Sequence, residues 1–243
     1  MATPPASHPV SNRSLYFLDI IGENNQILPP IHGYEDKPLV SLEDAVEPLK
    51  SLVIYVGKMV SCAKEGNMKA FKNLSHNQIG SIRLYTLEWE PREKSFFYLL
   101  NQTLRAEERD KVKPWFLFLK LIMTALGQLP SISAEVYRGV KGDLRSQYSV
   151  GTIFTWWGFS SCTSRKDVLE GDQFLGIKGK RTMFVINCKS GKDIRELSFY
   201  RNEFEVLLLP ATRFRVTKCS VSSDLTTIGL EELQSEPVIS PFP

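Results

Sequence analysis

The pattern of hydrophobic and polar positions divides the chain into an opening segment, a helical half and a strand-rich half. Ser41 has the position of a helix N-cap, and Ser75-x-x-Gln78 has the pattern of a capping box. We expect Pro48 to interrupt or kink the first helix, whereas Pro114 suits the first turn of the last one. The predicted helices are 41–64, 75–88, 93–105 and 113–126.

After Pro130, short runs of Val, Ile, Phe and Thr alternate with Gly, Lys and Asp, which is typical of strands and turns. One further helix is expected over 165–174, with Thr163 or Ser164 as its cap. Helices segregated from strands predict an α+β fold. We expect an irregular segment at 1–40 and a tail at 233–243. The predicted strands are 134–138, 153–160, 181–188, 204–209, 212–221 and 225–230.

Length and charge exclude little but remove one class of partner. The 243 residues allow one large domain or two small ones. The 30 Lys and Arg residues against 27 Asp and Glu leave a net charge of +3, without a block of like charge. That excess is too small to indicate a nucleic-acid partner.

The cysteines and histidines are dispersed, with no Cys-x-x-Cys and no histidine cluster. We therefore expect no metal site. The cysteines are interpreted as mostly buried thiols of a reducing compartment. A bridge between Cys188 and Cys219 stays open, because both fall in predicted strands. The residues concerned are Cys62, Cys162, Cys188, Cys219, His8, His32 and His76.

The N-terminal residues 1–9 contain no basic region followed by an apolar one, so we expect no secretory leader. The longest apolar stretch, 115–129, is interrupted by Lys120, Thr124 and Gln128. We therefore expect no transmembrane span and an intracellular location.

Two carboxylates stand two positions apart, at Glu203 and Glu205, directly before a run of strand-forming residues. On extended backbone both side chains would point to the same face, where they could act on one substrate. The alternative is a solvated edge strand, since a short Glu-x-Glu pattern alone is loose.

Two upstream segments add candidate chemistry. Arg138 lies in a short apolar strand that ends at Gly139, where it needs either an anion or a structural carboxylate partner. Phe159 leads into a run of small hydroxyl side chains that includes Ser160 and Ser161.

An Arg on a first strand, an aromatic-Ser run on a second and Glu-x-Glu before a later one resemble the arginine-specific mono-ADP-ribosyltransferases. Further stretches that resemble eukaryotic members are Leu84-Tyr85-Thr86 and Asn101-Gln102-Thr103-Leu104-Arg105. The resemblance covers roughly residues 40–232. It implies a single catalytic domain at 41–232, with a helical lobe at about 41–130 and a split β-sheet core at about 131–232.

The resemblance implies NAD, or NADP, as a co-substrate that is not permanently bound, and arginine side chains of proteins as acceptors. Glu205 would stabilise the oxocarbenium-like ribose as nicotinamide leaves. Glu203 would orient the acceptor guanidinium and assist its loss of a proton. Ser161 would hold Glu205 in position and contribute to the NAD site.

Four more residues receive roles from the same resemblance. Arg138 would bind the NAD diphosphate through its planar fork, and Gly139 would let backbone groups approach the nicotinamide amide. Phe199 and Tyr200 would contact the acceptor, with simple packing as the alternative. Arg201 could lower the pKa of the glutamates, be a self-modification site, or face water.

The hydroxyl run departs from the usual Ser-x-Ser pattern of the family. Alignment on Phe159 makes Ser161 the functional serine, and a slip of one residue would select Ser160. Because such a slip turns the side chain to the other face of the strand, only one register can work.

Two other functions use the same features. An NAD glycohydrolase would replace the acceptor by water with the same residues, and a catalytically silent binding module would keep the fold without activity. The intact set of Arg138, Ser161, Glu203 and Glu205 argues against the silent module. A dehydrogenase is disfavoured, because no Gly-x-Gly-x-x-Gly follows a strand.

Overall fold

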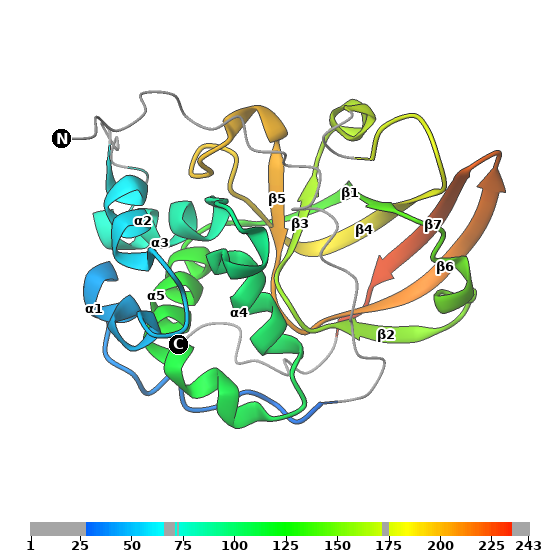
Figure 1. Ribbon diagram of the computed structural model, residues 1–243. Coiled ribbons are helices and arrows are strands. Elements are labelled where there is room, and N and C mark those ends of the chain that lie inside the picture. Colours follow the sequence, from blue (N-terminus) through cyan, green and yellow to red (C-terminus); the bar gives the residue numbers. More distant parts are fainter. Residues whose placement is uncertain (1–27, 66–70, 72, 172–174, 235–243) are drawn as a thin grey trace.

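The computed structural model describes residues 28–65, 71, 73–171 and 175–234. Helices gather on one side of the molecule and strands on the other, so the predicted α+β class is confirmed (Figure 1). The predicted features at 1–27, at the C-terminal end of helix 165–174 and in most of the 233–243 tail lie outside the described residues.

The helical lobe begins at the predicted caps. The Ser41 side chain accepts a hydrogen bond from the Asp44 amide, and Ser75 with Gln78 forms the complete capping box. The elements are α1 (Leu42–Val46), η2 (Glu47–Leu49), α2 (Val56–Lys64), α3 (His76–Thr86), η3 (Arg92–Lys94), α4 (Phe96–Arg105), η4 (Arg109–Trp115) and α5 (Phe116–Gly127).

The helix predicted over 41–64 is interrupted, as expected at Pro48, and the chain leaves the α-helical path between α1 and α2. Pro48 lies in the first turn of η2, where its missing N–H costs nothing but prevents continuation of α1. Tyr55, at a φ of 61°, then turns the chain into α2. Two short helices result, and both bury one face against the core of the lobe.

Seven strands form the other lobe, in the order β1-β3-β5-β4-β7-β6-β2, with an additional β1–β4 pairing. The pair β4–β7 is parallel and the other pairs are antiparallel. The strands are β1 (Ser131–Lys141), β2 (Ile153–Trp156), β3 (Ser160–Thr163), β4 (Arg181–Asp193), β5 (Glu205–Leu208), β6 (Thr212–Ser222) and β7 (Leu225–Glu232). Short 3-10 turns η5 (Arg145–Gln147), η6 (Lys166–Glu170) and η7 (Arg201–Glu203) connect them.

The long strand β4 divides the sheet. Residues 181–187 pair with β7, whereas Lys192 and Asp193 pair with β5, and β1 follows the other edge of β4. Since β3 bridges β1 and β5, the strands β1, β3, β5 and β4 pair in a closed ring. Gly191 lies at the division, where a Cβ would approach the Val206 side chain to 2.9 Å.

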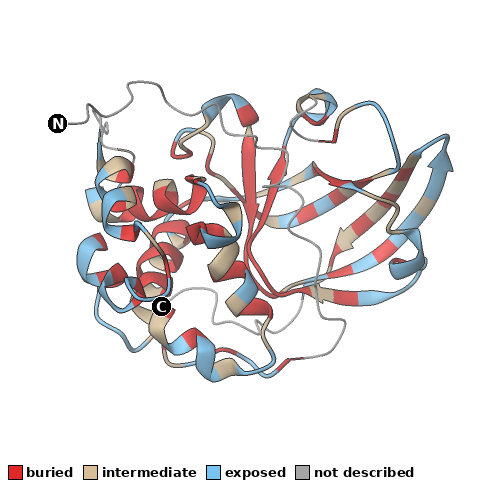
Figure 2. Ribbon diagram, viewed as in Figure 1, coloured by how far each residue is buried: buried red, intermediate tan, exposed pale blue. Residues whose placement is uncertain are grey.

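Strands β3 and β5 are buried on both faces, whereas buried and partly buried residues alternate along β7 (Figure 2). One apolar cluster fills the helical lobe and reaches the inner face of β5 at Leu207. A second cluster, around Trp156, Phe184 and Phe214, packs under the other face. Because they lie between two cores, β3 and β5 hold their side chains in fixed positions.

The single strand predicted over 153–160 is wrong, because this segment forms two strands with different partners. Strand β2 pairs with β6 and β3 pairs with β5. Between them, the Asn101 side chain of α4 accepts from the Phe159 amide at 2.9 Å and donates to its carbonyl at 3.2 Å. A Cβ on Gly158 would lie 3.0 Å from the Asn101 Oδ1, so glycine permits this close approach.

The expected cap of helix 165–174 is also wrong. Thr163 belongs to β3, and among the described residues of this segment 166–170 form a 3-10 turn without a side-chain cap. All four cysteines carry free thiols, which excludes the Cys188–Cys219 bridge in this structure. Within the described ranges, no helix has the length and apolar character needed to cross a membrane.

Candidate active site

Glu205 is the first residue of β5, and its side chain is fully buried. Its Oε1 accepts a hydrogen bond from the Ser161 Oγ at 2.8 Å, and its Oε2 accepts one from the Ser198 Oγ at 2.9 Å. A buried carboxylate is costly unless its oxygens are satisfied, and here two hydroxyl groups do so. The orientation of the Glu205 carboxylate is therefore fixed from both sides.

The pairing of β3 with β5 brings Ser161 to this carboxylate. Thr163 lies opposite Glu205 and Ser161 lies opposite Leu207, so these side chains share one face. Ser160 lies on the alternate face with Cys162, which packs in the second apolar cluster. The geometry thus places Ser161, and not Ser160, at Glu205.

Ser198 is a site residue that no pattern in the sequence indicates. It lies seven residues before Glu205, on the segment that leads into η7, and its hydroxyl also accepts from the Tyr200 amide at 3.2 Å. No spacing rule indicates this contact, because the chain between the two residues turns irregularly. Only the folded position of that segment brings the hydroxyl to the carboxylate.

Glu203 does not extend the strand of Glu205, so the expected shared face of an extended Glu-x-Glu is wrong. Glu203 ends the turn η7, and Phe204 adopts the left-handed conformation with a φ of 51°. Thr163 donates from its Oγ1 to the Glu203 carbonyl at 2.8 Å, and the Ser164 amide donates to the Phe204 carbonyl at 3.1 Å. The end of β3 therefore supports the turn that carries Glu203.

Two guanidinium groups contact the Phe204 ring at the same turn. The Arg165 guanidinium lies 4.8 Å from the centre of its ring, and that of Arg195 lies 5.7 Å from it. Such cation–π contacts help to hold a bulky residue in a conformation that is unfavourable for it.

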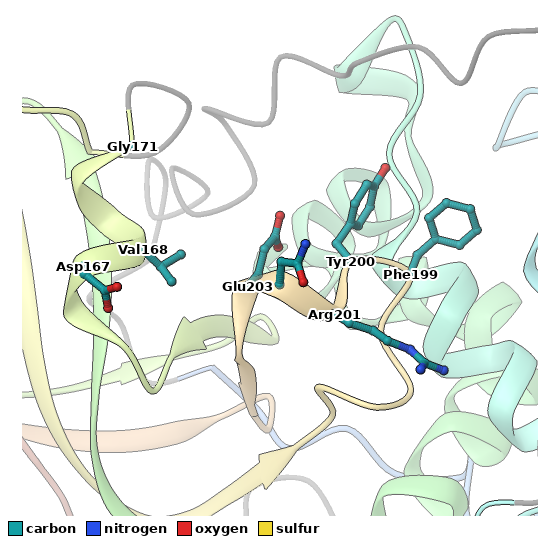
Figure 3. Close-up of a pocket in the computed structure, with 8 residues that line it drawn as sticks. Asp167, Val168, Gly171, Phe199, Tyr200, Arg201 and Glu203 are labelled. Carbon is teal, nitrogen blue, oxygen red and sulfur yellow. The ribbon is translucent and has the colours of Figure 1, made fainter.

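A cavity of ≈ 570 Å³ opens beside this turn, between η6 and the segment 199–203. Glu203 lines it although only 6% of its surface is exposed, and Val168 and Asp167 of η6 form the facing wall (Figure 3). The side chains of Glu203 and Tyr200 point to the same side of the turn (Figure 3). We refer to this space as the Glu203 cavity.

Phe199 and Tyr200 both line the Glu203 cavity. Phe199 points towards the helical lobe (Figure 3), where the Thr86 Oγ1 accepts from its amide at 3.0 Å and the Arg83 guanidinium lies 5.2 Å from its ring. The Arg201 side chain is exposed, and its guanidinium lies 3.7 Å from the Glu196 carboxylate. An exposed guanidinium agrees with two of the three predicted alternatives, a side chain that faces water and a self-modification site.

Arg138 lies beneath β3. Its side chain is 1% exposed, its Nη1 donates to the Ser161 carbonyl at 3.0 Å, and its guanidinium lies 5.6 Å from the Trp156 ring. Its Nε has no hydrogen-bond partner among the described residues. The guanidinium thus supports the backbone of Ser161 from the face opposite to Glu205.

Gly139 follows on the other face of β1. A Cβ there would lie 3.0 Å from the Leu175 Cβ and 3.5 Å from the Leu169 Cδ2, so the present packing excludes a larger side chain. Within the described ranges, no group of three or more Asp, Glu, His and Cys side chains could hold a metal ion.

Comparison with known proteins supports one family. Residues 43–237 match the sequence profile described as NAD:arginine ADP-ribosyltransferase. The chain is 32% identical over 157 residues to the NAD(+)--protein-arginine ADP-ribosyltransferase Tre1 of Serratia proteamaculans, covering 63% of this chain and 31% of Tre1. It is 28% identical over 128 residues to the putative NAD(+)--arginine ADP-ribosyltransferase Vis of Vibrio splendidus, covering 50% of this chain and 51% of Vis. The chain therefore spans between about a third and a half of the length of these curated relatives.

Solved structures show the same fold. The eucaryotic mono-ADP-ribosyltransferase ART2.2 superposes with a TM-score of 0.57 at 18% identity, covering 90% of this chain and 96% of that one. The arrangement of a helical lobe beside a divided sheet is thus shared with a eukaryotic enzyme of this class, although few residues are identical.

Proposed function

The chain belongs to the NAD:arginine ADP-ribosyltransferase family, and on that premise we propose that it cleaves the nicotinamide–ribose bond of NAD and transfers ADP-ribose to arginine side chains of an acceptor protein. One observation carries this proposal: Glu205 is fully buried, and both of its carboxylate oxygens accept hydrogen bonds from serine hydroxyls. A charge fixed in this way can stabilise a developing positive charge without first reorganising.

The first step breaks the bond between ribose C1′ and the nicotinamide nitrogen, and the bonding electron pair leaves with neutral nicotinamide. No acid is required, since the leaving group already carries a positive charge in NAD. Ribose becomes oxocarbenium-like, and the Glu205 carboxylate stabilises it. Ser161 and Ser198 act as positioning residues, because each restrains one oxygen of that carboxylate.

The second step forms a bond between C1′ and a nitrogen of the acceptor guanidinium. Arginine is a poor nucleophile because its guanidinium stays protonated in proteins. Glu203 is proposed to orient the guanidinium and to accept the proton that is lost on attack. Glu203 ends η7 on the wall of the Glu203 cavity, and this position leaves room for such an acceptor.

The predicted contact of Arg138 with the NAD diphosphate stays a prediction. In the present arrangement its guanidinium is buried and bonded to the Ser161 carbonyl, which supports a positioning role for the strand that carries Ser161. Gly139, Phe199 and Tyr200 keep their proposed roles at the nicotinamide and at the acceptor. Among relatives, an erythroblast enzyme of Gallus gallus is named for NAD(P)(+), and NADP is therefore proposed as an alternative donor.

The test is incubation of the purified protein with NAD and agmatine, a small guanidine, while nicotinamide and ADP-ribosyl-agmatine are measured together. We expect both products to accumulate. Nicotinamide without the conjugate would contradict the arginine acceptor and indicate a glycohydrolase or another acceptor. Absence of both products would contradict the proposal, and a measurement of NAD binding would then identify a silent module. A competition assay with NAD and NADP, in which the conjugate formed from each is measured, identifies the preferred ADP-ribose donor.

A further inference from the structure

A second cavity of ≈ 570 Å³ lies on the helical-lobe side of Phe199 and Tyr200. Its walls come from α2, from the segment that follows α3, and from these two aromatic residues. We refer to it as the α2–α3 cavity. The side chains that make it largely apolar are Met59, Cys62, Leu87 and Trp89.

The indole of Trp89 is a buried polar group in these walls. Trp89 is only 8% exposed, and its indole Nε1 has no acceptor among the described residues. A buried donor without a partner is unfavourable, and tryptophan N–H groups in such places usually find one. An apolar cavity beside an unused donor suits a ligand that has an apolar body and an acceptor oxygen.

The charges around the α2–α3 cavity have both signs. Lys58 and Arg83 line it together with the carboxylates Glu65 and Glu88. Burial and the nearby Arg201 guanidinium lower the pKa of Arg83, whose Nε already donates to the Ala63 carbonyl. Because two cations stand beside two carboxylates, the walls carry no net charge, which suits a neutral stretch of polypeptide better than the charged phosphates of a dinucleotide.

The two cavities share a wall, since Phe199 and Tyr200 line both. Contacts with Thr86 and Arg83 hold Phe199 against α3, so this wall is anchored to the helical lobe. A polypeptide that places one side chain in the Glu203 cavity therefore continues directly over the α2–α3 cavity.

We propose that the α2–α3 cavity docks the acceptor polypeptide, taking an apolar side chain that lies a few residues from the target arginine. The Nε1 of Trp89 is buried in the present structure, and a small rotation of the indole would let the backbone carbonyl beside that side chain accept its hydrogen bond. The proposal rests on the proposed transfer to arginine and adds a determinant of acceptor choice. Small guanidines such as agmatine do not reach this cavity and do not depend on it.

The test compares peptides in which a single arginine is flanked by serines with peptides in which one flanking serine, at each position in turn, is replaced by leucine. We expect one leucine position to raise kcat/KM roughly tenfold, as burial of one such side chain implies. The variant Met59→Trp, which fills the cavity, should remove this preference. Its nicotinamide release and its transfer to agmatine should equal those of the wild type.

The control variant is Val221→Trp, which makes the same type of change on the exposed surface of β6. It should keep the leucine preference. Absence of any leucine preference in the wild type, or a preference that persists in Met59→Trp, would overturn the docking site. Transfer to agmatine is measured alongside and separates the two proposals. If the wild type modifies agmatine but shows no leucine preference, only the docking site is wrong. If the wild type modifies neither agmatine nor peptide, the proposed function is wrong and the docking site with it.

A second measurement requires no substitution. Cys62 lines the cavity, whereas Cys219 is similarly half-buried on β6 and provides an internal control. The leucine-containing peptide should slow alkylation of Cys62 by N-ethylmaleimide and leave Cys219 unchanged. Equal rates with and without the peptide would overturn the proposal. Protection of Cys62 by NAD alone would also overturn it, because the cavity would then belong to the dinucleotide site.

Discussion

Glu203 and Glu205 are two residues apart, but they occupy different kinds of structure. Glu205 begins a strand between two apolar cores, and both of its oxygens are bonded to serine hydroxyls. Glu203 ends a 3-10 turn on the wall of a cavity, and its turn is supported through backbone carbonyls. The difference teaches that one short motif can combine a fixed charge with a group placed for an incoming partner.

The two carboxylates should therefore fail differently when they are changed. A fixed charge serves bond cleavage whatever the acceptor is, because the positive charge develops on the donor ribose. A carboxylate on a cavity wall serves only reactions in which an acceptor enters that cavity. Substitutions at the two positions should separate cleavage from transfer.

The largest effect is expected for Glu205→Gln. The amide keeps the shape and can still bond with Ser161 and Ser198, but it carries no charge. Nicotinamide release should fall by roughly 10²–10³-fold, as on removal of other preorganised electrostatic groups. A thermal melt serves as the control for folding. Cleavage at a near wild-type rate would show that Glu205 is not the stabilising charge.

A smaller and more selective effect is expected for Glu203→Gln. Transfer to agmatine should fall by roughly 10²-fold, because the amide cannot accept the guanidinium proton. Nicotinamide release into water should persist at a substantial rate. Parallel assays of the two products on the same sample make the comparison, and retained transfer to agmatine would remove the acceptor role from Glu203.

Ser161→Ala should weaken cleavage through the Glu205 carboxylate. Loss of one hydrogen bond to a charged group costs about 1.5–3 kcal/mol, which corresponds to roughly a tenfold to hundredfold lower kcat. Ser160→Ala is the matched control, because its side chain points to the other face of β3. Equal losses in the two variants would mean that general damage to the strand, and not the carboxylate contact, explains the result.

Arg138→Lys tests the support beneath β3. A lysine keeps the charge but loses the planar fork and its stacking on Trp156, so we expect a roughly severalfold lower kcat/KM for NAD. If Arg138 acts by positioning Ser161, Arg138→Lys should lower kcat/KM less in a protein that already carries Ser161→Ala than in the wild type. Full additivity in this double-mutant cycle would instead indicate an independent role such as diphosphate binding.

The smallest effect is expected for Tyr200→Ala, a substitution in the segment that leads into η7 and Glu203. Removing the ring from the wall of the Glu203 cavity should raise KM for agmatine by roughly twofold to tenfold, while nicotinamide release changes little. Initial rates over a range of agmatine concentrations provide the test. An equal fall in nicotinamide release would place Tyr200 with the cleavage machinery.

The sequence allowed prediction of features that depend on local chemistry. Both helix caps, at Ser41 and Ser75, are present where their patterns indicated them. The division into helices and strands also follows from local composition. Positions of the candidate residues came from the resemblance to a family, and the structure then selected Ser161 through its contact with Glu205.

Features that depend on distant contacts were not predictable. The break between β2 and β3 requires Asn101 of α4, which bonds to Phe159 across 58 positions of sequence. The turn at Glu203 requires a left-handed conformation at Phe204. The sequence does not indicate it, because the residue at that position is neither glycine nor asparagine. Ser198 reaches Glu205 only because the segment before η7 folds back on it.

The pairing of β3 with β5 has a consequence for how the gene can change. Ser161 and Glu205 meet because Thr163 pairs with Glu205, whatever the length of chain that connects the strands. Codons inserted or deleted in the intervening loops leave that meeting intact, whereas a single codon gained or lost within β3 or β5 turns one partner to the wrong face. Length variation in descendants of this gene should therefore accumulate in the loops and be purged from these two short strands.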